Sequence, residues 1–167
     1  MNPDPIFFWI ERSALSIWLR ESTSLLAFPF ILILHAIGMG FLAGTAAAMG
    51  LRVLGLLRAI PLGAMARFLP FAWVGFWINA VSGVLLLIAY PGKALTNPLF
   101  YFKLACIAVA VAFLRMLTAG VLRKTPEPVA IPMKFRRMAG VSLALWVTAI
   151  TSGRLLAYTY TRLLTDN

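Results

Sequence analysis

The chain has 167 residues, of which 62% are hydrophobic and 12% charged, and its formal net charge is +10. Soluble domains are typically about 45–50% apolar and about 25% charged, so this composition excludes an ordinary soluble domain. The positive charge does not indicate nucleic-acid binding, because the basic residues lie in the gaps between long apolar runs, as in membrane proteins. We therefore expect an integral membrane protein surrounded by a lipid bilayer, without a nucleic-acid partner.

The segment 5–20 predicts a helix that lies on the membrane surface. It follows Asp4, and Pro5 occupies what would be the first helical position, a pattern typical of a helix start. The segment is too short and too charged to cross a bilayer, which requires about 20 apolar residues. Trp9 and Trp18 are suited to anchor such a helix at the interface. We expect an N-terminal interfacial amphipathic helix.

The segment 24–51 predicts the first membrane-spanning helix. It contains no charged residue and exceeds the length that a span requires. His35, the single histidine of the chain, lies near its middle. Pro29 near its beginning either ends the preceding loop or kinks the helix. Gly40 and Gly44 form a small-xxx-small pair, which would allow another helix to approach closely.

Three more apolar segments predict three further spans, at about 71–90, 99–122 and 138–160. In the first of these, Gly75, Asn79 and Gly83 repeat every four residues and therefore share one helix face. We expect this face to pack against another helix, with Asn79 supplying an interhelical hydrogen bond. The predicted fold is an all-α integral membrane four-helix bundle, forming a single transmembrane domain over 1–167.

The distribution of charge predicts the orientation. With four spans, one side of the membrane carries nine basic residues and one acidic residue, a net charge of +8, while the other carries six basic and four acidic residues, a net charge of +2. The more positive side is expected in the cytoplasm. We therefore expect a multi-pass protein of the bacterial inner membrane with both termini on the periplasmic side.

Three polar residues fall within the same half of the predicted bundle. At 1.5 Å per residue, His35 lies roughly 15 Å, Lys103 roughly 6 Å and Arg154 roughly 9 Å below the periplasmic ends of their spans. Charged side chains within spans usually face the bundle interior or a polar cavity. A single pocket open towards the periplasm would hold all three. Alternatively, His35 only hydrogen-bonds a serine or a carbonyl of a neighbouring helix, and the two cations reach the interface.

An imidazole beside two cations suits an anionic ligand with an apolar body, and haem b fits that description. His35 would ligate the iron, and Lys103 would be the opposite ligand or, with Arg154, a partner of the propionates. Asn79 completes the set of candidate cofactor-binding residues. A quinone headgroup bonded by His35 and a copper ion held by His35 and Met39 are the alternative ligands.

These ligands correspond to three functional hypotheses. The leading one is a haem b-binding redox or electron-transfer subunit that works with a protein partner or as a homo-oligomer. The second is a transport or accessory protein for copper or another small solute. The third is a membrane anchor subunit without a ligand. No residue is predicted to be catalytic.

Short motifs also resemble known families. The His-x-x-Gly from His35 to Gly38, and the Lys-Leu that begins at Lys103, resemble a loose group that includes the membrane domain of copper-resistance protein D and the J-type protoporphyrinogen IX oxidase. The resemblance to that oxidase implies a haem-binding role for His35 and an essential role for Lys103. When the motifs at 69–75 and 153–155 are included, the chain most resembles a family of small four-span bacterial membrane proteins. This resemblance implies no particular activity.

Overall fold

The computed structural model describes the backbone of residues 9–122 and 130–165, and the side chains of 9–121 and 130–156. Every regular element in these ranges is a helix. Four helical segments of the described part are long and apolar enough to cross a membrane: Phe28–Leu54, Leu62–Ala89 (which comprises two helices, the second much longer), Pro98–Val121 and Met133–Leu156. The prediction of an all-α, multi-pass membrane bundle is confirmed.

The described elements follow one another along the chain as α2 (Ala14–Glu21), α3 (Phe28–Leu54), α4 (Leu62–Ala66), α5 (Leu69–Ala89), α6 (Pro91–Leu95), α7 (Pro98–Leu117), η1 (Thr118–Leu122) and α8 (Met133–Thr165). The short helices α4 and α6 lie between the spans that the sequence predicted. The π-helical turn η1 continues α7. Pro29 lies in the first turn of α3, where proline needs no hydrogen-bond partner, so it begins this helix and does not kink it.

The helix predicted over 5–20 is interrupted: residues 9–11 are helical, 12 and 13 form a turn and a bend, and α2 follows. Ser13 is its N-cap, since its hydroxyl accepts a hydrogen bond from the Ser16 N–H at 3.2 Å. The proposed start at Asp4 lies outside the described residues. The Ser16 hydroxyl donates to the Ile88 carbonyl at 2.9 Å, and Leu19 is buried. These contacts attach α2 to the end of α5.

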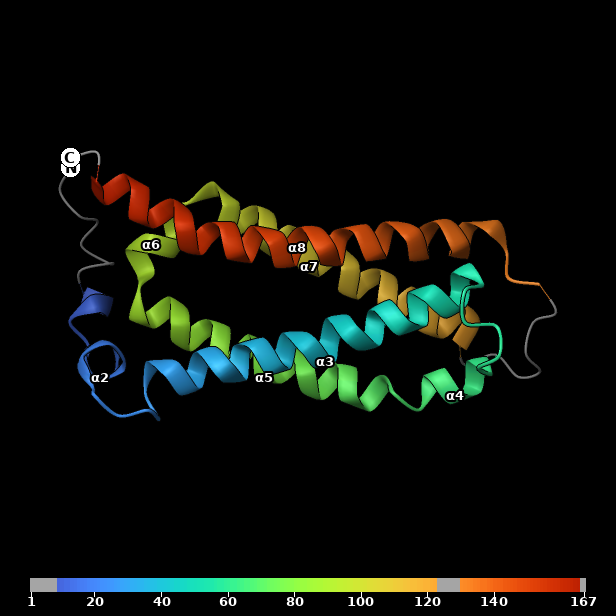
Figure 1. Ribbon diagram of the computed structural model, residues 1–167, viewed down its shortest axis with the longest axis horizontal. Coiled ribbons are helices and arrows are strands. Elements are labelled where there is room, and N and C mark those ends of the chain that lie inside the picture. Colours follow the sequence, from blue (N-terminus) through green and yellow to red (C-terminus); the bar gives the residue numbers. More distant parts are fainter. Residues whose placement is uncertain (1–8, 123–129, 166–167) are drawn as a thin grey trace.

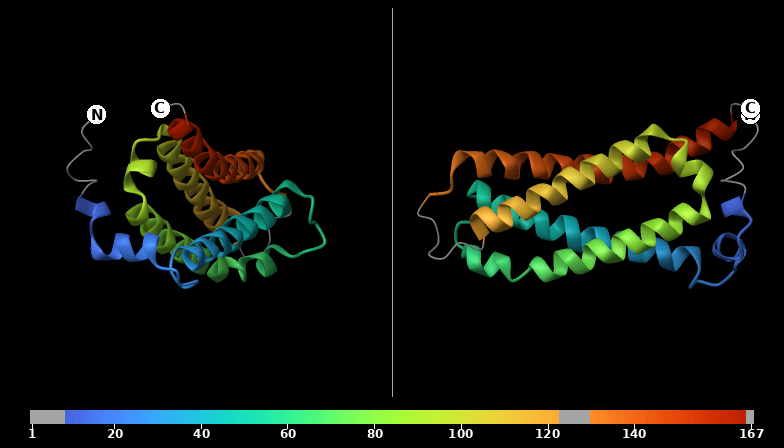
Figure 2. Two further views of the ribbon diagram at one scale, coloured as in Figure 1. Left: turned by 60° about the vertical axis from the view of Figure 1, so that its left-hand side comes forward. Right: turned by 180° about the vertical axis from the view of Figure 1, so that it is seen from behind.

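The four long helices form two pairs. The helix α3 packs along α5, α7 packs along α8, and α3 also contacts α8 (Figures 1 and 2). The helices α2 and α6 and the C-terminal part of α8 lie at one end of the bundle, whereas α4 and η1 lie at the other (Figure 1). We call these the α6 end and the α4 end.

The closest approach between α3 and α5 occurs at two glycines. A Cβ atom at Gly38 would lie 2.7 Å from the Asn79 nitrogen, and one at Gly75 would lie 2.8 Å from the Gly38 carbonyl oxygen. Only glycine allows the two backbones to come this close. A Cβ atom at Gly40 or Gly44 would meet no atom of the described residues within 4 Å, so these residues show no close helix approach at that pair.

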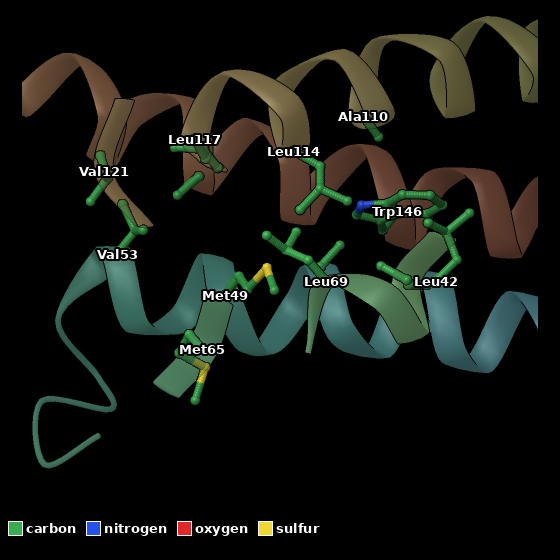
Figure 3. Close-up of a cluster of buried hydrophobic side chains, with 14 of the residues drawn as sticks. Leu42, Met49, Val53, Met65, Leu69, Ala110, Leu114, Leu117, Val121 and Trp146 are labelled. Atoms are coloured by element: carbon green, nitrogen blue, oxygen red, sulfur yellow. The ribbon is translucent and has the colours of Figure 1, made fainter. Parts of the chain in front are cut away.

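The main hydrophobic core fills the half of the bundle towards the α4 end. Figure 3 shows Met49 and Val53 of α3 facing Leu114 and Leu117 of α7, with Trp146 of α8 beside them. A second, small cluster around Leu19, Ile31 and Ala89 lies near the α6 end. The large side chains thus pack tightly over one half of the bundle, and the other half contains a cavity.

Candidate functional site

A cavity of about 530 Å³ lies between α3, α5, α6, α7 and α8. This volume is within the range of roughly 300–1,000 Å³ that is usual for cofactor and small-molecule sites. Its wall is mainly apolar, with Phe28, Phe76 and Phe100 among the lining residues. Its ionisable side chains are His35, Tyr90, Lys93 and Lys103, and the amide of Asn79 also lines it. An apolar cavity with few polar groups is typical of a ligand site.

The imidazole of His35 is held by α5. Its Nδ1 lies 3.0 Å from the Ser82 hydroxyl oxygen. A Cβ atom at Gly83 would lie 3.3 Å from His35 Cε1, so the absence of a side chain there makes room for the ring. The Asn79 amide donates to the His35 backbone carbonyl at 2.8 Å, which confirms the predicted interhelical hydrogen bond. The face of α5 that carries these residues therefore fixes both the backbone and the ring of His35.

The hydrogen bonds of Ser82 determine which ring nitrogen carries the proton in the neutral imidazole. The Ser82 hydroxyl lies 2.6 Å from the Ile78 carbonyl oxygen, and a contact between two oxygens at that distance requires the hydroxyl proton. Since a serine has one proton to donate, its oxygen accepts from His35 Nδ1–H. The lone pair of the neutral ring is therefore on Nε2.

This Nε2 atom is available to a ligand. Among the described residues it has no hydrogen-bond partner. Nε2 is also not fully buried. In the described part of the chain, Trp146 Nε1 is the one side-chain nitrogen or oxygen that is both fully buried and without a hydrogen-bond partner, and Nε2 has no such partner either. A histidine that ligates a metal usually donates its other N–H to a fixed acceptor, as Nδ1 does here. The serine bond that the sequence offered as a ligand-free explanation accounts for only one of the two ring nitrogens.

Lys103 comes to the same cavity from α7. A Cβ atom at Gly153 of α8 would lie 3.3 Å from its Nζ, so this glycine gives the ammonium group its space. No hydrogen bond or ion pair of Lys103 occurs with any residue that the structure describes, although charged groups within spans are usually paired. The lysine is thus a cation available to an anionic ligand.

The structure brings together three of the five predicted site residues, which are His35, Asn79 and Lys103. The other two belong elsewhere. Arg154 is exposed and does not belong to the wall of the cavity. Met39 packs against the main hydrophobic core and does not belong to the wall of the cavity. The sequence predicted how deep each site residue lies along its helix, but it did not predict the direction in which each side chain points around the helix axis.

Sequence reasoning missed three features of the site. Ser82 lies three residues after Asn79 and hence on the same helix face, so its contact with His35 could have been inferred. Lys93 lines the cavity from α6, a short helix between two predicted spans. Gly153 of α8 leaves space for the Lys103 ammonium group, and no signal in the sequence indicates that these two residues lie opposite each other.

Comparisons with protein-family models, with curated proteins and with solved structures find no match for this chain. The resemblance to the oxidase and to the copper-resistance protein therefore stays a prediction from short motifs.

Proposed function

We propose that the protein binds haem b in the cavity at the α6 end and serves as a redox subunit of the membrane. The observation that supports this most is the His35 imidazole, whose Nδ1 is fixed by Ser82 and whose Nε2 lone pair is available beside an apolar cavity. Nε2 would hold the haem iron. Bound haem would supply one-electron chemistry.

The remaining wall of the cavity suits the two chemical parts of this cofactor. The aromatic and aliphatic side chains would cover the porphyrin faces. Lys103 would pair with a propionate, because an ammonium group in a water-poor site gains from a carboxylate partner. Asn79 would act through the backbone of His35, by holding α3 and α5 together at that level. Arg154 and Met39 have no part in this proposal.

The proposed orientation places the α4 end in the cytoplasm of a bacterium, with the cavity in the periplasmic half of the inner membrane. The charge on the α4 end supports it. Thr96→Cys, at the α6 end, should react with a membrane-impermeant maleimide in intact cells, and Arg67→Cys, at the α4 end, should react only after lysis. The opposite pattern would reverse the proposed orientation without affecting the haem proposal.

The haem proposal is tested by an absorption spectrum of the detergent-purified protein, oxidised and reduced, with extracted haem measured against protein. We expect a Soret band, reduced α and β bands, and about one haem per chain. The His35→Ala variant should keep its helical circular dichroism and lose the haem. The Lys103→Met variant should bind haem more weakly and keep the His35-dependent spectrum.

Two control variants separate the cavity from its surroundings. Arg154→Met also removes a cation from the α6 half, and Met39→Leu also alters α3 one turn from His35, but both residues lie outside the cavity wall. Both variants should keep full haem content. A protein that is colourless after expression with added haem, or a His35→Ala variant that retains its haem, would overturn the proposal.

A quinol or quinone is the second candidate ligand. His35 Nε2 offers an acceptor and Lys103 offers donors in one apolar cavity, which together could bond a quinol hydroxyl or a quinone carbonyl. A colourless protein that carries extractable quinone, and loses it in His35→Ala, would favour this ligand over haem. Copper is supported less, because Met39 packs in the core and the described residues contain no cluster of three or more histidine, cysteine or acidic side chains.

A further inference from the structure

A second cavity, of about 400 Å³, lies at the α4 end of the bundle and is distinct from the site around His35. Three arginines from three segments line it. Arg52 belongs to the last turn of α3, Arg58 to the loop that follows, and Arg136 to the first turn of α8. We infer that this cavity binds a phosphate group.

Each guanidinium group is already oriented by a backbone carbonyl near the C-terminal end of α3. Arg52 donates to the Ile60 carbonyl, Arg58 donates to the Gly55 carbonyl at 3.0 Å, and Arg136 donates to the Leu54 carbonyl at 2.9 Å. Because a guanidinium group has five N–H donors, one such bond leaves most of them available. Each guanidinium group is thus held in place and still has N–H donors for a ligand.

Two of these groups converge on one point above Gly55. A Cβ atom at Gly55 would lie 3.2 Å from Arg58 Nε and 3.8 Å from Arg136 Nη2. Gly55 has a φ of 95°, a left-handed conformation that glycine adopts without strain and that ends α3. No described residue that lines the cavity is acidic. An anion at this point would be stabilised by both guanidinium groups.

A phosphate group is the anion that this arrangement fits. Guanidinium groups bind phosphate oxygens through paired hydrogen bonds, whereas a lysine offers only a point charge. The cavity lies at one end of the membrane-spanning helices. Basic pockets between such helices bind anionic lipid headgroups. The neighbouring Leu56 is 71% exposed and offers an apolar contact at the same end. Either the phosphodiester of an anionic lipid or free phosphate would supply this chemistry.

Purified full-length protein in an uncharged detergent is titrated with inorganic phosphate, phosphatidylglycerol or phosphatidylcholine, while its thermal unfolding is followed. We expect phosphatidylglycerol, inorganic phosphate or both to raise the Tm, and phosphatidylcholine to have no effect. A response to phosphatidylglycerol alone identifies a lipid headgroup site. A response to inorganic phosphate as well identifies a site open to free phosphate.

The Arg58→Gln/Arg136→Gln variant should weaken the binding of the active ligand at least about tenfold, because each lost hydrogen bond involves a charged group. The matched control is Arg67→Gln/Arg137→Gln, which removes the same charge from exposed positions at the same end and should change the binding less than about threefold. Should the first variant not fold, Arg58→Lys/Arg136→Lys keeps the charge and should still weaken binding, because it loses the paired bonds. Equal responses in the site and control variants, or no response of the native protein to either phosphate source, would overturn the inference.

Discussion

The contact between α3 and α5 can be tested with two glycines of the same helix. A Cβ atom in Gly38→Ala would lie 2.7 Å from the Asn79 nitrogen and 2.9 Å from the Gly75 carbonyl oxygen, both backbone atoms. Ordinary contact needs about 3.4 Å, so the helices would have to separate locally by roughly 0.7 Å. Inserting a methyl group into such a contact typically costs about 1–3 kcal/mol.

Gly40→Ala is the matched control, because a Cβ atom there meets nothing within 4 Å. Both variants exchange glycine for alanine inside one helix, so the gain in helix propensity, about 1 kcal/mol, is common to both and cancels in their difference. We expect Gly38→Ala to be less stable than Gly40→Ala by about 1–3 kcal/mol, measured by unfolding in mixed micelles with increasing dodecyl sulfate. Equal stabilities would refute the close contact at Gly38.

Three other predictions concern the polar and thiol groups between the helices. Ser82→Ala should reduce haem affinity about 10–100-fold, because it removes the hydrogen-bond partner of His35 Nδ1. Ser152→Ala removes a bond that lies within α8 and should leave haem affinity unchanged. Haem titration of both variants measures the difference. Asn79→Ala should destabilise the bundle by about 1 kcal/mol through the lost bond to the His35 carbonyl, as unfolding in dodecyl sulfate would show, and an unchanged stability would contradict that role. Cys106 is 5% exposed, so a maleimide should label it slowly in the native protein and fully after denaturation; rapid native labelling would place it on the surface.

The sequence predicted the class of fold and part of the site. Long uncharged runs indicated membrane-spanning helices, because few other structures satisfy every backbone polar group within a bilayer. The spacing of Gly75, Asn79 and Gly83 indicated one packed face of α5, and the hydrogen bond of Asn79 to the His35 carbonyl confirms it. The pairing of Gly38 with Gly75 could not be predicted, because Gly40 and Gly44 look equally suitable when the partner helix is unknown.

What the sequence determined by itself is the set of apolar helices and the presence of rare polar side chains within them, since both follow from the solvent properties of a bilayer. Only the tertiary structure decided which of these side chains meet. The rotation of each helix about its axis is set by packing against its neighbours, and that rotation turns Lys103 towards His35 and leaves Arg154 exposed. The fixed Nδ1 and the available Nε2 of His35 likewise depend on Ser82, a residue 47 positions away that only the packing of α3 on α5 brings into contact.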